Sequence, residues 1–171
     1  MEASIGQPVM ATKFTFRAYE REFGFELLKL WRQSFHDAIG VPNDTGLDAV
    51  QDHLAFLQSL DPAAMTVALD PQNSAIAGFM TLIGAEVEQL YVHGDYQHQG
   101  LGAQFIARAK QGRDHLILYT FERNKGAQAF YDQQGFIIKA RGFAGMAENP
   151  WATSQDQLAD IRYEWQREAA R

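Results

Sequence analysis

Two kinds of hydrophobic pattern follow one another along the chain. Alternation of apolar and polar residues predicts a first strand at residues 14–17 and a last one at residues 160–165. Apolar runs bounded by turn residues predict the strands between them, at residues 65–69, 76–83, 87–92, 116–120 and 136–140. Apolar residues at helical spacing predict helices at residues 27–35, 47–57, 101–110 and 124–134. The order β-α-α-β-β-β-α-β-α-β-β predicts an α/β fold of mixed α+β type, with helices packed on the faces of one mixed sheet.

The residues at the ends of the predicted helices are typical caps, and nothing in the sequence separates the chain into domains. Gly135 suits the left-handed position that follows a helix, and Asp44 and Thr45 are candidate caps of the second helix. No repeat, low-complexity tract or flexible linker interrupts the pattern. We therefore expect a single domain over residues 1–171, with residues 1–12 frayed.

Charge and composition narrow the classes of function. Fifteen Lys and Arg against 21 Asp and Glu give a net charge of −6, which argues against nucleic acid as the main ligand. The absence of cysteine excludes disulfides, thiolate metal sites and a covalent intermediate on a thiol. The five histidines show no metal-ligand spacing, so no metal is expected. No apolar stretch approaches the about 18 residues of a membrane span, and no signal sequence is visible, which predicts a cytoplasmic protein without a membrane partner.

A glycine-containing loop between a predicted strand and a predicted helix is the most informative segment. The strand ends at Val92, and the helix begins near Leu101 with Gly100 and Gly102 beside its start. The first amides of a helix lack intrahelical partners and glycines admit a close ligand, so the loop suits a phosphate or pyrophosphate. It matches neither a Rossmann fingerprint, because Phe105 stands where the third glycine is needed, nor a Walker loop. The alternative is a tight turn without a ligand.

Two separate segments carry longer patterns. The first is Gln97-His98-Gln99-Gly100-Leu101-Gly102, and the second is Asn124-Lys125-Gly126-Ala127-Gln128-Ala129-Phe130-Tyr131 followed by Gly135-Phe136. They resemble the Q/R-x-x-G-x-G/A and N-x-x-A-x-x-F-Y-x-x-x-G-F motifs of the GNAT superfamily of N-acetyltransferases. The resemblance implies the GNAT fold, a central mixed and mostly antiparallel sheet of about seven strands with a splayed parallel pair, flanked by about four helices.

This resemblance also implies a binding site for acetyl-CoA. In GNAT enzymes the strand that corresponds to Leu90, Tyr91 and Val92 pairs through its main chain with the pantetheine arm, and loop amides bind the pyrophosphate. The implied loop residues are Gln97, His98, Gln99, Gly100, Leu101, Gly102 and Ala103. Asn124 matches an asparagine that contacts the cofactor arm, although N-capping of its helix is an alternative role.

Two residues are candidates for proton transfer. Tyr131 matches the family tyrosine that is the usual proposed general acid for the CoA thiolate, and its alternative role is that of a core tyrosine. Glu88 is the candidate base, because regular alternation would place it on the strand face of Leu90 and Val92. Glu86, or water, is the alternative base, and a solvated carboxylate without a catalytic role is the other interpretation of Glu88.

These observations predict direct transfer of an acetyl group from acetyl-CoA to a primary amine of a small molecule. The alternatives are an amine of a protein or peptide, and a non-catalytic module that binds acyl-CoA. In the family, residues 35–46 and 143–160 would determine the acceptor. Trp31, Phe35 and Trp151 are interpreted as core residues. A homodimer is the commonest arrangement among soluble homo-oligomers.

Overall fold

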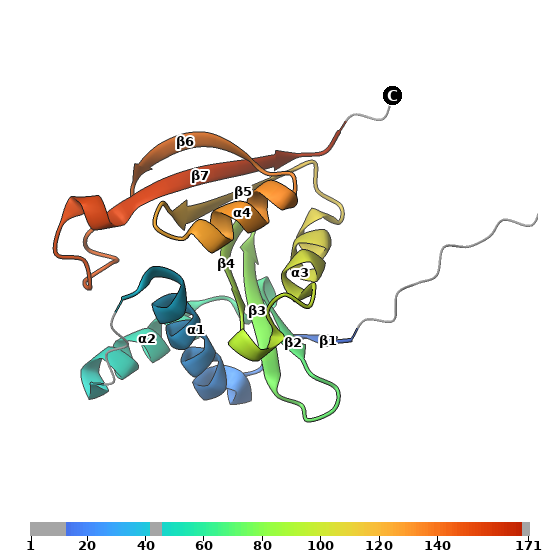
Figure 1. Ribbon diagram of the computed structural model, residues 1–171. Helices are drawn as coiled ribbons and strands as arrows, with labels where there is room; N and C mark the ends of the chain where they lie inside the picture. Colours follow the sequence, from blue (N-terminus) through green and yellow to red (C-terminus); the bar gives the residue numbers. More distant parts are fainter. Residues whose placement is uncertain (1–12, 42–45, 169–171) are drawn as a thin grey trace, which may run out of the picture.

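The computed structural model describes residues 13–41 and 46–168, and within these residues it contains seven strands and four α-helices (Figure 1). The strands are β1 Thr15–Ala18, β2 Met65–Leu69, β3 Ile76–Ile83, β4 Glu86–Val92, β5 His115–Phe121, β6 Ile137–Phe143 and β7 Ala159–Gln166. The α-helices are α1 Gly24–Ile39, α2 Leu47–Ser59, α3 Leu101–Lys110 and α4 Lys125–Gln133. Short 3₁₀ helices are η1 Arg21–Phe23, η2 Pro62–Ala64, η3 Gly94–Tyr96 and η4 Gln155–Leu158. The predicted α/β architecture is therefore confirmed.

All described strands belong to one sheet, in the order β1-β2-β3-β4-β5-β7-β6. Neighbouring strands are antiparallel except β4 and β5, which are parallel. The parallel pair is short, because only Glu86 with Ile117 and Val87 with Leu118 are in register among the described residues. Beyond these positions β4 and β5 diverge, which confirms the splayed parallel pair and leaves a gap between their carboxyl ends.

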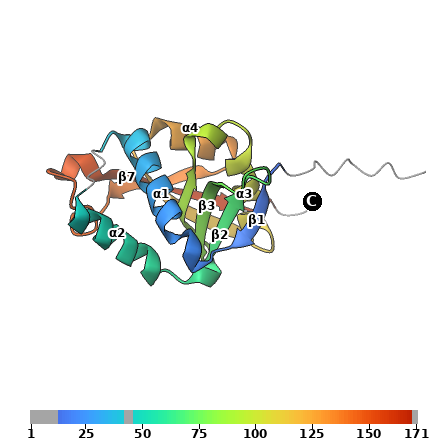
Figure 2. The same ribbon diagram turned by 90° about the horizontal axis from the view of Figure 1, so that it is seen from below.

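The helices bury two hydrophobic clusters against the two faces of this sheet (Figures 1 and 2). Leu27 and Leu28 of α1 and Leu57 of α2 pack with Phe79 of β3 in what we call the α1/α2 core. On the other face, Phe105 and Ile106 of α3 and Tyr131 of α4 belong to the α3/α4 core. The amphipathic patterns of the predicted helices account for both layers, because each helix turns its apolar stripe toward the sheet.

Most predicted boundaries lie within three residues of the observed ones. Gly135 has φ +79°, which confirms the left-handed conformation expected after α4. Strand β6 extends past the predicted residue 140 to Phe143, because its ladder with β7 continues to Ala159. Gly46 occupies the N-cap position of α2. Asp44, Thr45 and residues 1–12, to which we assigned caps and a frayed end, lie outside the described residues.

Candidate active site

The gap between β4 and β5 exposes main-chain groups of both strands. Leu90, Tyr91 and Val92 use one edge of β4 to pair with β3, and their other edge faces the diverging β5. Within the part of the chain that the structure describes, no strand pairs with β4 along this second edge beyond Val87. An unpaired strand edge can pair with an extended ligand that carries amide groups. The binding of a pantetheine arm by these three residues stays a prediction.

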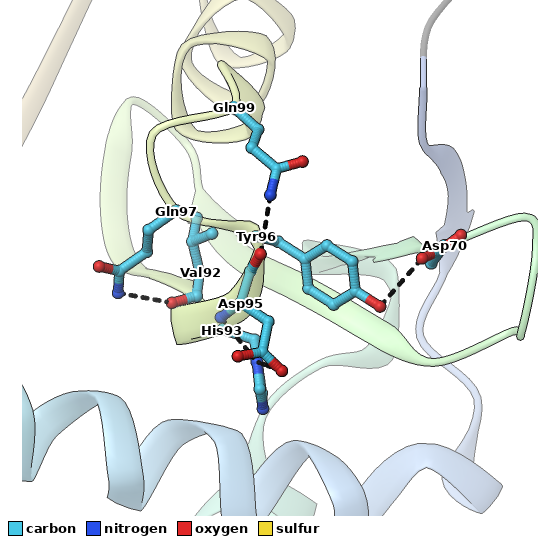
Figure 3. A network of polar contacts seen from close by, with 7 residues as sticks. All are labelled: Asp70, Val92, His93, Asp95, Tyr96, Gln97 and Gln99. Carbon is cyan, nitrogen blue, oxygen red and sulfur yellow. Dashed lines mark hydrogen bonds and ion pairs between the residues drawn. The ribbon is translucent and has the colours of Figure 1, made fainter.

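Residues 93–103, which we call the cofactor loop, connect this strand to α3. Gln97 Nε2 donates to the carbonyl oxygen of Val92 at 3.1 Å, and Gln99 Nε2 donates to the carbonyl oxygen of Asp95 at 2.7 Å (Figure 3). His98 and Gly100 have positive φ, at +57° and +81°. Both glutamine side chains therefore fold back on the loop and stabilise its main chain.

The amides at the start of α3 are available to a ligand. Gln104 N donates to the carbonyl oxygen of Gly100 at 3.1 Å, so hydrogen bonding within α3 begins there. Within residues 13–41 and 46–168, the structure gives no acceptor for the amides of Leu101, Gly102 and Ala103. These amides and the positive end of the helix dipole favour an anionic group. Lys13, just before β1, adds a positive charge nearby, since its ammonium donates to the Gln99 side chain.

The two loop glycines are needed for different reasons. Gly100 has a left-handed backbone, and a Cβ added there would have no atom within 4 Å, so it is the backbone conformation that favours glycine. At Gly102, a Cβ would lie 3.0 Å from Cζ of Phe130, because α3 and α4 approach each other closely there. The sequence analysis assigned Gly102 only to the approach of a ligand, and it missed this contact between helices.

Tyr131 lies deep in the α3/α4 core with only 8% of its surface exposed. Its ring centroid lies 5.2 Å from that of Phe130, 5.7 Å from Phe136 and 5.9 Å from Tyr163. Burial, and secondly the nearby Tyr91, raises the pKa of Tyr131 well above its ordinary value. Tyr131 is therefore a core tyrosine, and its hydroxyl group keeps a proton that it can donate. Its role as general acid stays a prediction.

Tyr91 packs on the opposite face of the sheet from Tyr131. Its ring packs against Phe79 in the α1/α2 core, with the centroids 5.6 Å apart. Burial raises the pKa of Tyr91 to about 12, and a hydrogen bond with the Trp31 side chain opposes this rise. Tyr91 packs against the α1/α2 core, whereas Tyr131 belongs to the α3/α4 core, so the two side chains lie on different faces of the sheet.

Asn124 caps α4, as the alternative interpretation proposed. Its side-chain oxygen accepts a hydrogen bond from the amide of Ala127 at 3.0 Å, and its own amide donates to Phe121 O at 2.9 Å. Asn124 thus joins the end of β5 to the start of α4. A contact between Asn124 and a cofactor arm stays a prediction.

A β-bulge interrupts the regular pairing of β4 at Glu88. Thr81 and Leu82 are consecutive in β3, but they pair with Gln89 and Val87 of β4, so Glu88 is the additional residue. Val87 and Leu90 both belong to the α3/α4 side of the sheet although they are three residues apart. The bulge interrupts the two-residue alternation on which the shared face of Glu88, Leu90 and Val92 was predicted, so that face no longer follows from the strand pattern.

Glu88 nevertheless has the electrostatic environment of a candidate base. Partial burial, and secondly the charge of Glu86, raises the pKa of the Glu88 carboxyl group. A raised pKa makes a carboxylate a better proton acceptor near neutral pH. The Glu88 side chain is partly covered but still reaches solvent, so it can accept a proton either directly or through water. The role of Glu88 as the base, with Glu86 or water as the alternative, stays a prediction.

An aromatic cluster brings together three distant parts of the chain. The ring centroid of Phe35 in α1 lies 6.1 Å from that of Phe121 in β5 and 6.0 Å from that of Trp151, which precedes η4. Phe121 and Trp151 are 5.6 Å apart. All three are half-buried and lie outside both cores, so Phe35 and Trp151 are not the core residues that we expected. Trp31 packs instead on His53 and Phe56 of α2.

Carboxylates lie beside this aromatic cluster. Asp160 of β7 pairs in register with Phe121 of β5, so their side chains share one face of the sheet. Partial burial, and secondly the charge of Glu122, raises the pKa of Asp160. Glu122 itself forms an ion pair with Arg141 of β6. Sequence reasoning missed Phe121 and Glu122, because only the folded sheet brings β5 to this cluster. Asp160 is the last residue of the range 143–160 that was expected to determine the acceptor.

The described residues give no further indication of a metal or a membrane. Among residues 13–41 and 46–168, no group of three or more histidine or acidic side chains could hold a metal ion. In the same part of the chain, no helix is long and apolar enough to span a bilayer.

Comparison with known proteins gives consistent results. The family model described as "Acetyltransferase (GNAT) domain" matches residues 61–138. The peptidyl-lysine N-acetyltransferase YjaB of Salmonella typhimurium is 29% identical over 127 residues, which cover 73% of this chain and 84% of that protein. The solution structure of apo YjaB from Escherichia coli aligns with a TM-score of 0.66 and 22% identity, over 88% of this chain and 96% of that one. The PaiA N-acetyltransferase of Thermoplasma acidophilum, in complex with coenzyme A, gives a TM-score of 0.62 and 16% identity, over 91% and 100% of the two chains.

Proposed function

The chain belongs to the GNAT superfamily of acetyl-CoA-dependent N-acetyltransferases, and we propose that its acceptor is the side-chain amine of a lysine in a protein or peptide. The observation that carries this proposal is the likeness to relatives named peptidyl-lysine N-acetyltransferase, which extends over 84% of their length. The sequence analysis favoured a small-molecule amine and gave a protein or peptide amine as the alternative. We now prefer this alternative.

The residues around the gap fit acetyl-CoA as the donor substrate. The free edge of β4 at Leu90, Tyr91 and Val92 can pair with the amides of pantetheine. The amides that begin α3 at residues 101–103 can bind the pyrophosphate, and the left-handed backbone of Gly100 leads into them. Acetyl-CoA supplies a thioester whose carbonyl carbon an amine can attack.

The protein's own groups would then move two protons. Glu88 is the proposed base, directly or through water, and accepts the proton that the attacking amine loses. Tyr131 is the proposed acid and donates its proton to the departing thiolate. The chain has no cysteine to carry the acetyl group, so we propose direct attack within a ternary complex. Sequential kinetics without an acetylated enzyme are the expected signature.

The surroundings of Phe121 support a cationic acceptor with an apolar stem. The aromatic cluster of Phe35, Phe121 and Trp151 offers ring faces and edges to methylene groups and to an ammonium group. The carboxylate of Asp160 lies on the same sheet face as Phe121 and favours positive charge. A lysine side chain combines four methylene groups with an ammonium group, so both features suit it.

A panel of acceptors tests this proposal. Thiol release from acetyl-CoA is measured with lysine-containing peptides, matched peptides in which arginine replaces lysine, free amino acids, polyamines and aminoglycosides. We expect turnover with the lysine peptides, loss of turnover with the arginine peptides, and a mass increase of one acetyl group on lysine. Turnover restricted to small amines would return the assignment to the first prediction. Cofactor binding without turnover on any amine would contradict both.

A further inference from the structure

A hydrogen bond joins the cofactor loop to a distant turn of the sheet (Figure 3). The hydroxyl group of Tyr96, the last residue of η3, donates to Oδ2 of Asp70 at 3.0 Å. Asp70 directly follows β2 and is 9% exposed. The two residues are 26 positions apart, so the contact is a tertiary one. A phenol that donates to a buried carboxylate forms a charge-assisted hydrogen bond, which is stronger than a neutral one.

Asp70 is itself held in place by the turn between β2 and β3. Its Oδ1 accepts the amide of Gln72 at 2.9 Å, and its main chain bonds to Ala75 O at 2.9 Å and to Ser74 N at 2.8 Å. The amide, the carbonyl oxygen and both carboxylate oxygens of Asp70 are therefore hydrogen-bonded. Asp70 is a fixed point against which Tyr96 can be positioned.

Tyr96 in turn holds the first part of the cofactor loop. Its amide donates to His93 O at 2.9 Å, and its ring meets the edges of Phe14 and His93, with centroids 5.8 and 5.9 Å apart. Asp95, the preceding residue, is bonded through its carbonyl oxygen to Gln99 Nε2 and through its amide to His93 Nδ1. The position of Tyr96 therefore affects both the start of the loop and Gln99, one residue before Gly100.

We propose that Tyr96, through its hydrogen bond to Asp70, is a positioning residue that holds the cofactor loop in the conformation that binds the diphosphate of acetyl-CoA. This inference rests on the proposed function, because it assumes that the amides at residues 101–103 bind that diphosphate. A loop that occupies its binding conformation only part of the time binds more weakly in proportion to that fraction. The bond would thus raise affinity for the diphosphate end of the donor and leave the chemistry at the thioester unchanged.

The test compares two donors that share the thioester but differ in the diphosphate end. S-acetylpantetheine lacks the 3′-phospho-ADP part of acetyl-CoA. In Tyr96→Phe, which keeps the ring and its packing, kcat/KM with acetyl-CoA should fall about five- to twentyfold, as expected for loss of one charge-assisted hydrogen bond. With S-acetylpantetheine, kcat/KM should stay within about twofold of wild type, because the missing bond acts only through the diphosphate.

Two further variants separate positioning from general stability. Asp70→Asn retains a carbonyl oxygen for Gln72 N and weakens the same bond, so the double variant should lose no more than the larger single effect. Tyr19→Phe removes a hydroxyl group from a tyrosine of the α1/α2 core and should leave the ratio between the two donors unchanged. Equal losses with both donors in Tyr96→Phe, or additive losses in the double variant, would overturn the inference. Equal use of both donors by the wild type would instead overturn the loop assignment itself.

Discussion

The cofactor loop and the aromatic cluster differ in how far apart in the sequence their parts lie. The loop is one continuous segment, residues 93–103, and its own glutamine side chains stabilise its main chain. The aromatic cluster takes Phe35 from α1, Phe121 from β5 and Trp151 from the segment before η4. A continuous loop can be recognised by its residue pattern, whereas the cluster exists only once three elements have packed together. The donor side is therefore more readily predicted than the acceptor side.

Tyr131 belongs to neither region, and its substitution should have the largest effect. Tyr131→Phe keeps the ring in the α3/α4 core and removes the hydroxyl group. If that group protonates the thiolate, the single-turnover rate should fall about 10²–10⁴-fold, which is about 3–5 kcal/mol. The Kd of acetyl-CoA should remain close to wild type. Rapid-quench measurements at saturating donor and acceptor check this, because slow product release could hide the change in steady state.

A thermal melt of the same Tyr131 variant supplies the control. A core tyrosine without a catalytic role predicts a change in stability at least as large as the change in rate. A folded variant that keeps more than about a third of the wild-type rate would remove Tyr131 from the mechanism, given the expected size of acid catalysis.

Glu88 should give the next largest effect and a distinct pH dependence. Its raised pKa means that the carboxylate is protonated, and inactive as a base, up to a higher pH than an ordinary glutamate. The acidic limb of kcat/KM should therefore fall as pH decreases through this raised pKa. Glu88→Gln should lower kcat/KM about 10²-fold and flatten this limb. The matched variant is Glu86→Gln; if it alone removes the limb, Glu86 and not Glu88 is the base.

Substitutions of Gly102 separate its role in packing α3 against α4 from its role in binding CoA. Gly102→Ala would place a Cβ 3.0 Å from Phe130 and should cost about 1–3 kcal/mol of stability through overpacking. Phe130→Leu in the same chain should recover part of this stability by making room. The increase in melting temperature that CoA causes in the wild type should be reduced in Gly102→Ala and remain reduced in the double variant. Full recovery of the CoA effect would show that Gly102 serves helix packing alone.

Trp151 tests whether the aromatic cluster acts on the acceptor and not on the donor. Trp151→Ala removes one ring of the cluster and should raise the KM of a lysine peptide about tenfold, which corresponds to about 1.4 kcal/mol. The KM of acetyl-CoA should not change. Phe25→Ala, at an exposed aromatic residue of α1 outside the cluster, is the control. Steady-state kinetics with each substrate varied in turn measure both KM values. A change in the KM of acetyl-CoA alone would contradict an acceptor role of the cluster.

The same contrast explains what could be predicted from the sequence. Strand and helix periods, the left-handed Gly135 and the splay of the parallel pair follow from local patterns and from the GNAT resemblance, and the structure confirms them. The orientation of Glu88 could not be predicted from the sequence. The bulge depends on the register of β4 with Thr81 and Leu82 of β3. Likewise, no local signal joins Tyr96 to Asp70, or Asp160 to Phe121.

Substitution of Asp160 should have the smallest effect. It should raise the stability of the protein and weaken acceptor binding. Partial burial, and then Glu122, raises its pKa in the folded state above the unfolded value. The folded protein therefore binds this proton more tightly, so stability is lost as pH rises through the folded pKa. Asp160→Asn removes that loss, and it should melt slightly above wild type at neutral pH, with the difference shrinking as the pH is lowered toward the range of an ordinary aspartate.

The same variant should nevertheless bind a cationic acceptor less well. Asparagine keeps the size of Asp160 but removes the negative charge beside Phe121, so the KM of a lysine peptide should rise while that of acetyl-CoA stays constant. Melting curves and kinetics from pH 5 to 8, compared with Asp52→Asn on the exposed surface of α2, measure both effects. A gain in stability without any change in acceptor KM would mean that the carboxylate does not face the acceptor. A rise in KM that disappears at high ionic strength would support an electrostatic contact, because salt screens charges that water can reach.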